Sequence, residues 1–230
     1  MFYFLITALS IALAWDPTAN TLSLFVDSTS SGSTEDGSEW NPFKSLQAAM
    51  ALLPELPYNG ENHEIRILAG GPYEWNTASI SYSLSIIGSN SEFTADGTFT
   101  VTSILKIENI RFILGSGTTN LIEVLSPGNL EVNEWNFDGL KQPLFLLQAP
   151  ATISDSIFTN LEESMIIITQ FGIGTVILMN NEITYNLKTI FSIILDGTVD
   201  PTHLIDLQVS GGNISHNTKS IPLMNLNVED

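Results

Sequence analysis

The chain contains no cysteine and few basic residues. Its 230 residues include 25 acidic side chains but only seven lysines and arginines, which gives a formal net charge of −18. Without disulfides, stability has to come from packing and backbone hydrogen bonds. The scarcity of cations argues against nucleic acid as a partner, and the negative charge should repel anionic membranes and polyanionic polymers unless Ca²⁺ bridges the two. A solvated acidic surface also keeps a β-rich chain soluble.

Long apolar runs are missing after the first residues. Residues 1–14, MFYFLITALSIALA, are too few to span a bilayer and end in the small-x-small pattern Ala12-Leu13-Ala14. This pattern predicts a signal peptide cleaved before Trp15, and therefore a secreted or cell-surface protein. Because the stretch lacks the usual Lys or Arg near its start, a buried first strand or a membrane anchor is the alternative. No later segment predicts a transmembrane helix.

The sequence does contain a repeat, which becomes visible when five apolar anchors are aligned. The anchors are Phe112, Phe137, Phe158, Ile183 and Ile214. Seven positions earlier stand Leu105, Leu130, Ala151, Val176 and Leu207, and five positions earlier stand Ile107, Val132, Ile153, Leu178 and Val209. Alternate positions of a short strand therefore point inward in every repeat.

A third apolar run follows each anchor, at 121–124, 144–147, 165–168, 190–194 and 221–224. Two earlier repeats begin at Ile65 and Leu84, and successive repeats start 19 to 31 residues apart. Unequal repeats of three short strands are expected when each repeat is one turn of a solenoid with surplus residues in outward loops. With 43% hydrophobic residues, the chain can bury a substantial core. We therefore predict an all-β parallel β-helix of about seven turns over residues 60–230.

Three other folds fit less well. Leucine-rich repeats need a helical segment in each repeat. A β-sandwich needs hairpin turns between adjacent strands, and a propeller needs four strands per blade. The sequence supplies none of these features at regular intervals.

The best helix candidate precedes the repeats. Asn41 is a suitable cap, Pro42 suits the first helical position, and Pro54 would end the helix. Four apolar residues share one face at helical spacing: Phe43, Leu46, Met50 and Leu53. We predict a capping helix over residues 42–54 that covers the apolar first turn and its unpaired edge. Residues 15–41 would form an opening strand and an acidic loop.

The start of the chain resembles right-handed parallel β-helix proteins of the pectin-lyase-like superfamily. These begin with a short strand, a Gly/Ser/Asp-rich loop, a Pro-Phe-x-(Thr/Ser)-(Ile/Leu)-Gln-x-Ala segment and a capping helix; residues 25–50 read FVDSTSSGSTEDGSEWNPFKSLQAAM. Two later segments, IRILAGGPYEW and SLSIIGSN, resemble the first turns of the family. The resemblance covers residues 25 to roughly 225 and implies a right-handed β-helix, but it implies little chemistry, because the superfamily contains lyases, hydrolases, esterases, adhesins and proteins without known activity.

The catalytic motifs of that superfamily are missing. Pectate lyases use clustered carboxylates for Ca²⁺ and an arginine base, but Arg66 and Arg111 are the only arginines and neither adjoins an acidic cluster in the sequence. The Asn-Thr-Asp, Asp-Asp, Gly-His-Gly and Arg-x-Lys elements of polygalacturonase-like hydrolases are absent, as is the Gly-x-x-Asp-Phe context of pectin methylesterases. We therefore expect a structural, adhesive or carbohydrate-contacting module without catalysis or cofactor. The alternative is a polysaccharide lyase or glycoside hydrolase with an atypical acidic site.

One polar column is the best candidate for such a site. Three positions before the anchors stand Asn109, Glu134, Asp155, Asn180 and Gly211. Stacked turns would put Glu134 over Asp155 with their backbones about 4.8 Å apart, a separation compatible with shared protonation, a retaining glycosidase pair or a Ca²⁺ site. The flanking asparagines favour the other interpretation, a polar corner whose side chains hydrogen-bond to the turning backbone.

Four further features are weaker candidates. The acidic loop carries Asp27, Glu35, Asp36 and Glu39, which would either bind Ca²⁺ or simply be solvated. The histidines, His63, His203 and His216, lack metal-ligand spacing and are expected at the surface. Three aromatic residues would form either a sugar-stacking platform or packing beside the cap: Tyr73, Trp75 and Tyr82. Asn213 lies in the only N-glycosylation sequon, Asn-Ile-Ser.

The sequence stops at Asp230, shortly after the last apolar run and without a second helix. Residues 227–230 would form a minimal cap, or the open end would pair with another subunit, or the chain is the front part of a longer surface protein, which is the interpretation we favour. An open end is a template for association. We therefore expect the isolated chain to associate end to end through its last turn.

Overall fold

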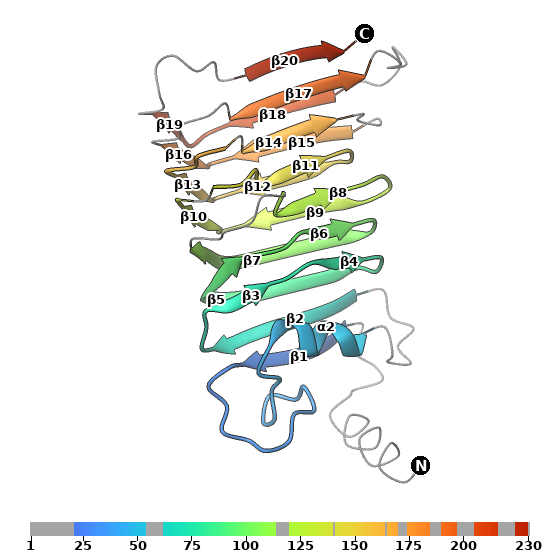
Figure 1. Cartoon of the computed structure of the whole chain (residues 1–230), viewed down its shortest axis with the longest axis vertical. Helices are drawn as coiled ribbons and strands as arrows, with labels where there is room; N and C mark the ends of the chain where they lie inside the picture. The colour runs from blue at the N-terminus through green and yellow to red at the C-terminus, as the bar shows by residue number, and fades with distance from the viewer. Residues whose placement is uncertain are drawn as a thin grey trace.

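The computed structural model describes residues 21–53, 62–113, 120–139, 141–163, 165–169, 174–184, 190–196, 205–215 and 224–229. The chain forms an elongated parallel β-solenoid, with β1 and the helix α2 at one end and β20 at the other (Figure 1). This confirms the predicted all-β parallel β-helix. Residues 1–14, the predicted signal peptide, lie outside the described residues. In the part of the chain that is described, no helix has the length and apolar character needed to cross a membrane.

The strands stack in three columns, and every pairing between them is parallel. The first column contains β1 (Thr21–Asp27), β2 (Asn62–Ala69), β5 (Leu84–Ala95), β7 (Ile104–Ile113), β9 (Asn129–Asn133), β12 (Ala151–Ser154), β15 (Gly174–Met179) and β18 (Ile205–Ser210). The second contains β3 (Tyr73–Trp75), the ends of β5 and β7, β10 (Asn136–Asp138), β13 (Ile157–Thr159), β16 (Glu182–Thr184) and β19 (Asn213–Ser215). The third contains β4 (Ala78–Ile80), β6 (Phe99–Val101), β8 (Ile122–Val124), β11 (Phe145–Leu147), β14 (Ile166–Thr169), β17 (Phe191–Asp196) and β20 (Met224–Glu229).

The predicted repeat matches the strand register. The anchor Phe137 pairs with Phe112 on one side and Phe158 on the other, and the column continues through Ile183 to Ile214. Most turns have three separate strands, whereas β5 and β7 continue around the first corner and serve two columns. The third column is a seven-stranded sheet.

Aromatic rings fill the middle of the solenoid. The ring centroids of Phe112 and Phe137 lie 5.1 Å apart at an interplanar angle of 3°, and those of Phe137 and Phe158 lie 5.2 Å apart at 11°. Phe93 continues the stack toward the N-terminal end, 5.8 Å from Phe112. All four rings are fully buried, because strict register places the same position of each turn above its predecessor.

The helix begins later than predicted. α2 spans Leu46–Leu52, and the side chain of Ser45 caps it by accepting a hydrogen bond from the backbone N of Ala48. The predicted start at residue 42, with Asn41 as the cap, is wrong because Phe43 is extended and forms a parallel bridge with Val26 of β1. The helix does bury apolar residues against the first turns, as expected of a cap: Leu46, Ala49 and Met50.

The last predicted apolar run was also misplaced. We expected the third strand of the final repeat at 221–224, but β20 spans Met224–Glu229 and pairs Met224 with Phe191 of β17. Residues 221–223 lie outside the described residues. The alternation Met224-Leu226-Val228 was the better strand signal, because a period of two marks a strand more reliably than a short apolar run.

The two ends of the solenoid differ within the described residues. At the N-terminal end, the backbone N of Phe25 in β1 donates to the carbonyl of Gly37, and the N of Phe43 donates to the carbonyl of Phe25, both at 2.9 Å. At the other end, β18, β19 and β20 are each the last strand of their column. Val209 and Ile214 are 48% and 40% exposed there. End-to-end association through this turn stays a prediction.

Candidate functional site

A groove of about 330 Å³ lies on the outer face of the first column, across β5, β7, β9 and β12. Alternate residues of each strand point outward, so every strand contributes two side chains to the groove. These are Ser85 and Ile87, Lys106 and Glu108, Glu131 and Asn133, and Thr152 and Ser154. The short serine and threonine side chains at both ends leave space beside the longer ones at the centre.

Polar contacts tie the central groove residues to their neighbours. Lys106 Nζ lies 2.8 Å from Glu131 Oε2, and Ser154 Oγ donates to Asn133 Oδ1 at 3.0 Å. The ammonium group in the groove is thus neutralised by a carboxylate. The groove offers hydroxyl, amide and carboxylate groups, which can exchange hydrogen bonds with a polyhydroxylated ligand.

The other described cations are paired as well. Each of the five lysines and arginines in the described part of the chain lies within 4.0 Å of a glutamate oxygen: Lys44 with Glu35, Arg66 with Glu64, Lys106 with Glu131, Arg111 with Glu92 and Lys141 with Glu162. The hydrogen bond and charge of Glu64 raise the pKa of Arg66, and the charge of Glu39 adds to the effect. A basic group ready to receive a polyanion is therefore missing from the described surface.

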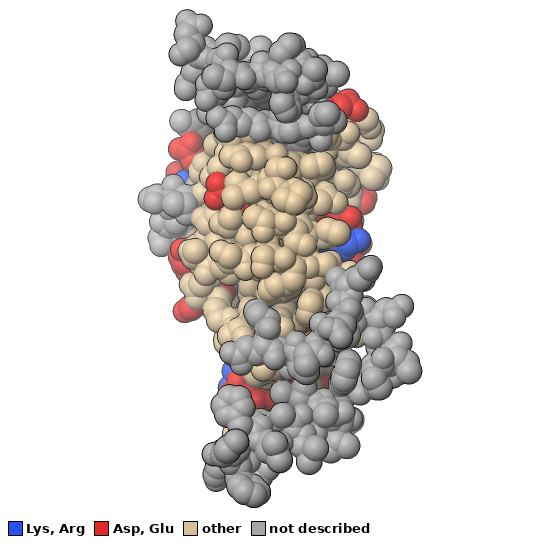
Figure 2. Space-filling view, turned by 90° about the vertical axis from the view of Figure 1, so that its right-hand side faces the viewer, with Lys and Arg blue, Asp and Glu red and all other residues tan. Residues whose placement is uncertain are grey.

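The acidic charge does not cover the surface evenly. Figure 2 shows a face with few charged side chains along its middle and acidic side chains at its flanks. The right-hand side of Figure 1, which faces the viewer in Figure 2, carries the segments that connect the third column to the next strand of the first column. Four of these segments, residues 81–83, 102–103, 125–128 and 148–150, include no Asp, Glu, Lys or Arg. Part of the solenoid is thus neutral despite the net charge of −18.

The predicted polar column forms the corner between the first and second columns. All five of its residues have a left-handed backbone: φ is 55° at Asn109, 54° at Glu134, 52° at Asp155, 57° at Asn180 and 64° at Gly211. Asparagine, aspartate and glycine adopt this conformation more readily than other residues. The composition of the column therefore follows from the corner, and Glu134 is its one unfavourable member.

Glu134 and Asp155 do occupy consecutive turns, since the residues before them, Asn133 and Ser154, are paired. Both carboxylates are exposed, and both residues border the groove because Asn133 and Ser154 line it. Asp155 Oδ1 accepts a hydrogen bond from Asn180 Nδ2 at 3.2 Å. The described residues contain no group of three or more His, Asp or Glu that could hold a metal ion. The contacts fit the corner ladder, and a catalytic or Ca²⁺-binding pair stays a prediction.

Replacing Glu134 by asparagine should stabilise the protein by about 1 kcal/mol, because asparagine tolerates the left-handed backbone better than glutamate does. Urea unfolding would measure the difference. Glu134→Gln removes the same negative charge, but glutamine tolerates the left-handed backbone no better than glutamate does. This variant should therefore gain little stability. Equal stabilisation by both variants would show that charge, rather than backbone conformation, limits this position.

A buried polar ladder, which the sequence analysis missed, supports the corner from inside. Asn181 Oδ1 accepts from the backbone N of Ser156 at 2.9 Å, and its Nδ2 donates to the carbonyl of Ile153 at 2.8 Å. Ser156 Oγ accepts from the backbone N of Trp135 at 3.0 Å and donates to the carbonyl of Ser154 at 2.7 Å. The signal was present, since the residue two positions before the anchor changes from Ile110 and Trp135 to Ser156 and Asn181 in successive repeats.

Carboxylates of the acidic loop accept hydrogen bonds from backbone N and hydroxyl groups of the same loop. Asp27 Oδ1 accepts from the backbone N and the hydroxyl of Thr29, at 2.8 and 2.6 Å. Asp36 Oδ1 accepts from the backbone N of Ser38 at 2.9 Å. Such contacts are typical of Asx turns. They account for the Asp and Ser content of the loop without a bound cation.

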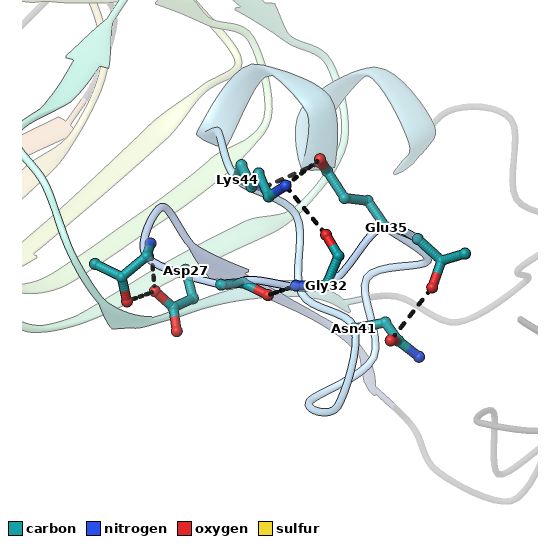
Figure 3. Close-up of polar contacts among 8 residues, drawn as sticks. Asp27, Gly32, Glu35, Asn41 and Lys44 are labelled. Atoms are coloured by element: carbon teal, nitrogen blue, oxygen red, sulfur yellow. Dashed lines mark hydrogen bonds and ion pairs between the residues drawn. The ribbon is translucent and has the colours of Figure 1, made fainter.

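Lys44 braces the same loop (Figure 3). Its Nζ donates to the carbonyl of Gly32 at 3.1 Å and lies 3.8 Å from Glu35 Oε1, while its backbone N donates to Glu35 Oε2 at 3.1 Å. Asn41 joins the network by accepting from Thr34 Oγ1 at 3.4 Å. The loop also presents Trp40, whose side chain is 89% exposed. The sequence analysis did not single out this residue.

Of the two expected roles of the aromatic residues near the first turns, packing is confirmed and the sugar-stacking platform is wrong. Trp75 is buried and stacks on Phe99 with ring centroids 3.8 Å apart, and Tyr73 is buried against Phe93 at 5.4 Å. Tyr82 packs against the core, and its burial raises the pKa of the phenol. These aromatic residues stabilise the first turns, because their alternate positions face the interior.

Two other predicted residues are described. His63 is half-buried, with its Nδ1 3.2 Å from the carbonyl oxygen of Ser83. Asn213 is exposed at the start of β19, and its glycosylation stays a prediction. His203 and His216 lie outside the described residues.

In comparisons with known proteins, no family model, no curated protein and no solved structure matches the chain. The parallel β-solenoid agrees with the fold implied by the resemblance to pectin-lyase-like proteins, and membership of that superfamily stays an expectation.

Proposed function

We propose that the chain is a secreted or cell-surface β-helix module that contacts a neutral polysaccharide through the groove on the first column, without catalysis. The groove itself carries this proposal: it runs across four stacked turns and is lined by hydroxyl, amide and paired charged groups. Each successive turn adds another pair of outward side chains, about 4.8 Å further along the solenoid axis. A groove elongated along this axis suits an extended polymer better than a compact ligand. The secreted or cell-surface location in this proposal is based on the predicted signal peptide, residues 1–14.

Charge favours a neutral polymer. The net charge of −18 repels polyanions, and the one ammonium group in the groove, that of Lys106, is paired with Glu131. A neutral polysaccharide meets no such repulsion, and its hydroxyl groups can donate to the carboxylates and accept from Ser, Thr and Asn.

The corner residues support a role without catalysis. The left-handed backbone explains why Asn, Asp and Gly recur beside the groove. The contact between Asp155 and Asn180 accounts for this aspartate as part of a ladder. Asp155 therefore needs no reaction to explain its presence.

A groove-filling variant tests the proposal. Replacing Thr152 by tryptophan should weaken binding to a neutral polysaccharide at least about tenfold, because displacing even part of the contact costs more than 1.4 kcal/mol. Affinity electrophoresis through gels containing mixed-linkage β-glucan, galactomannan, arabinoxylan or polygalacturonate would measure it.

The matched control is Gln208→Trp. Gln208 stands in the same outward column as Thr152, two turns further along, and lies beyond the groove. This variant should bind as the unmodified chain does. Equal weakening by the two variants, or stronger retention by polygalacturonate than by every neutral polymer, would contradict the proposal.

A further inference from the structure

Trp40 has the largest exposed fraction among the large apolar side chains of the described residues, 89%. Trp75 and Trp135, by contrast, are fully buried. Exposing an indole to water forfeits the stabilisation that its burial would give, so a loop that holds one outward points to a contact with something outside the chain.

The loop that presents Trp40 is held at several points. Lys44 joins Glu35 and the carbonyl of Gly32 on one side. On the other side, the backbone N of Asn41 donates to the hydroxyl and the carbonyl of Ser38, each at 3.2 Å. An aromatic side chain on an ordered loop loses little conformational entropy on binding.

The same loop stands in line with the groove. Phe25 of β1 is hydrogen-bonded to Gly37 and Phe43 of the loop segment, and it pairs with Arg66 of β2. Arg66 in turn pairs with Ile87, which lines the groove. The charge of Glu39, the neighbour of Trp40, acts on Arg66. The loop therefore lies beyond the N-terminal end of the groove, along the solenoid axis.

We propose that Trp40 is an aromatic subsite that extends the groove, where a sugar ring of a long neutral polysaccharide stacks on the indole. The inference rests on the proposed function and adds a second contact to it. The polymer would run from β12 across β9, β7, β5, β2 and β1 to the loop, a distance on the order of 29 Å at one strand spacing per step. The groove alone covers about half of that distance, so only long ligands reach Trp40.

Charge and chemistry favour a sugar at this position. The apolar face of a sugar ring packs on an indole as other flat apolar surfaces do. The nearby carboxylates of Glu35 and Asp36 are engaged within the loop, and the exposed Glu39 beside Trp40 adds negative charge that disfavours an anionic ligand. The net charge disfavours an anionic membrane as the alternative occupant.

Ligand length provides the test. Trp40→Ala should lower the affinity for soluble mixed-linkage β-glucan, galactomannan or arabinoxylan, whichever the unmodified chain binds best, by roughly fivefold. The affinity for a tetrasaccharide cut from the same polymer should not change. Trp40→Phe should restore most of the affinity for the polymer. Isothermal titration of the full chain and its variants measures all of these values.

The outcomes separate the inference from the proposed function. If the polymer binds the unmodified chain and the Trp40→Ala variant equally, the subsite is wrong and the groove proposal stands. Equal losses for polymer and tetrasaccharide would also overturn the subsite, because the effect would not depend on length. If no neutral polymer binds, both fail. Trp40-dependent binding to phosphatidylcholine vesicles, without any effect on polymer binding, would assign the residue to a lipid surface instead.

Discussion

Replacing Phe137 by alanine should lower the free energy of unfolding by about 3 to 5 kcal/mol. The ring is fully buried between Phe112 and Phe158, at 5.1 and 5.2 Å, and also contacts Trp135 at 4.8 Å. The backbone hydrogen bonds of the neighbouring turns fix the spacing of the stack, so the surrounding rings cannot close the cavity. Urea unfolding followed by tryptophan fluorescence measures the change.

Ile157→Ala is the matched control for this variant. Ile157 belongs to β13, next to β10, but its side chain points outward and is 37% exposed. Its loss should cost less than about 1 kcal/mol. Equal costs for the two variants would show that the aromatic stack is not the main support of the core.

Replacing Asn181 by alanine should cost about 2 to 5 kcal/mol, because it leaves two buried backbone groups without a partner. These are the N of Ser156 and the carbonyl of Ile153, which belong to the preceding turn. Asn181→Leu keeps most of the volume but makes neither hydrogen bond, so it should be nearly as damaging. Denaturant unfolding of both variants gives the two values.

The exposed Asn213 provides a comparison in the next turn. Asn213→Ala should change stability by no more than about 0.5 kcal/mol. If Asn181→Leu were as stable as the unmodified chain, packing volume rather than hydrogen bonding would support this corner, and the buried ladder would lose its assigned role.

The strand register could be predicted because two signals reinforce each other. A period of two identifies which residues face inward, and a repeat along the chain shows which inward residues stack. The columns through Phe137 and Val132 follow from these signals alone. The left-handed corner was foreseen as a polar turn, because Asn and Asp suit turning backbone.

The remaining features depend on contacts that no local pattern reports. The helix starts at Leu46 because β1 takes Phe43 as a partner, a tertiary contact that overrides the favourable capping residues upstream. Between Ile87 and Ser91, β5 has three residues where β7 has one, so the repeat is locally obscured. Trp40 and Trp75 carry the same side chain, and only the fold shows that one is exposed and the other buried.

The groove could not be predicted from the sequence either. Its lining residues are outward positions, which vary between turns and carry no repeat. The carboxylates at 134 and 155 drew attention because they align in the repeat, although their alignment follows from the corner. Residues that recur in a solenoid therefore report its architecture, while a binding surface is built from the positions that differ.

Incubation of the purified chain with neutral and anionic polysaccharides, with and without Ca²⁺, distinguishes a binding module from an enzyme when retention and product release are recorded together. We predict retention on at least one neutral polymer, unchanged by Ca²⁺ and without products. Products that disappear in the Glu134→Gln and Asp155→Asn variants would contradict it and identify an enzyme, and failure of every neutral polymer to bind would contradict a carbohydrate-contacting role.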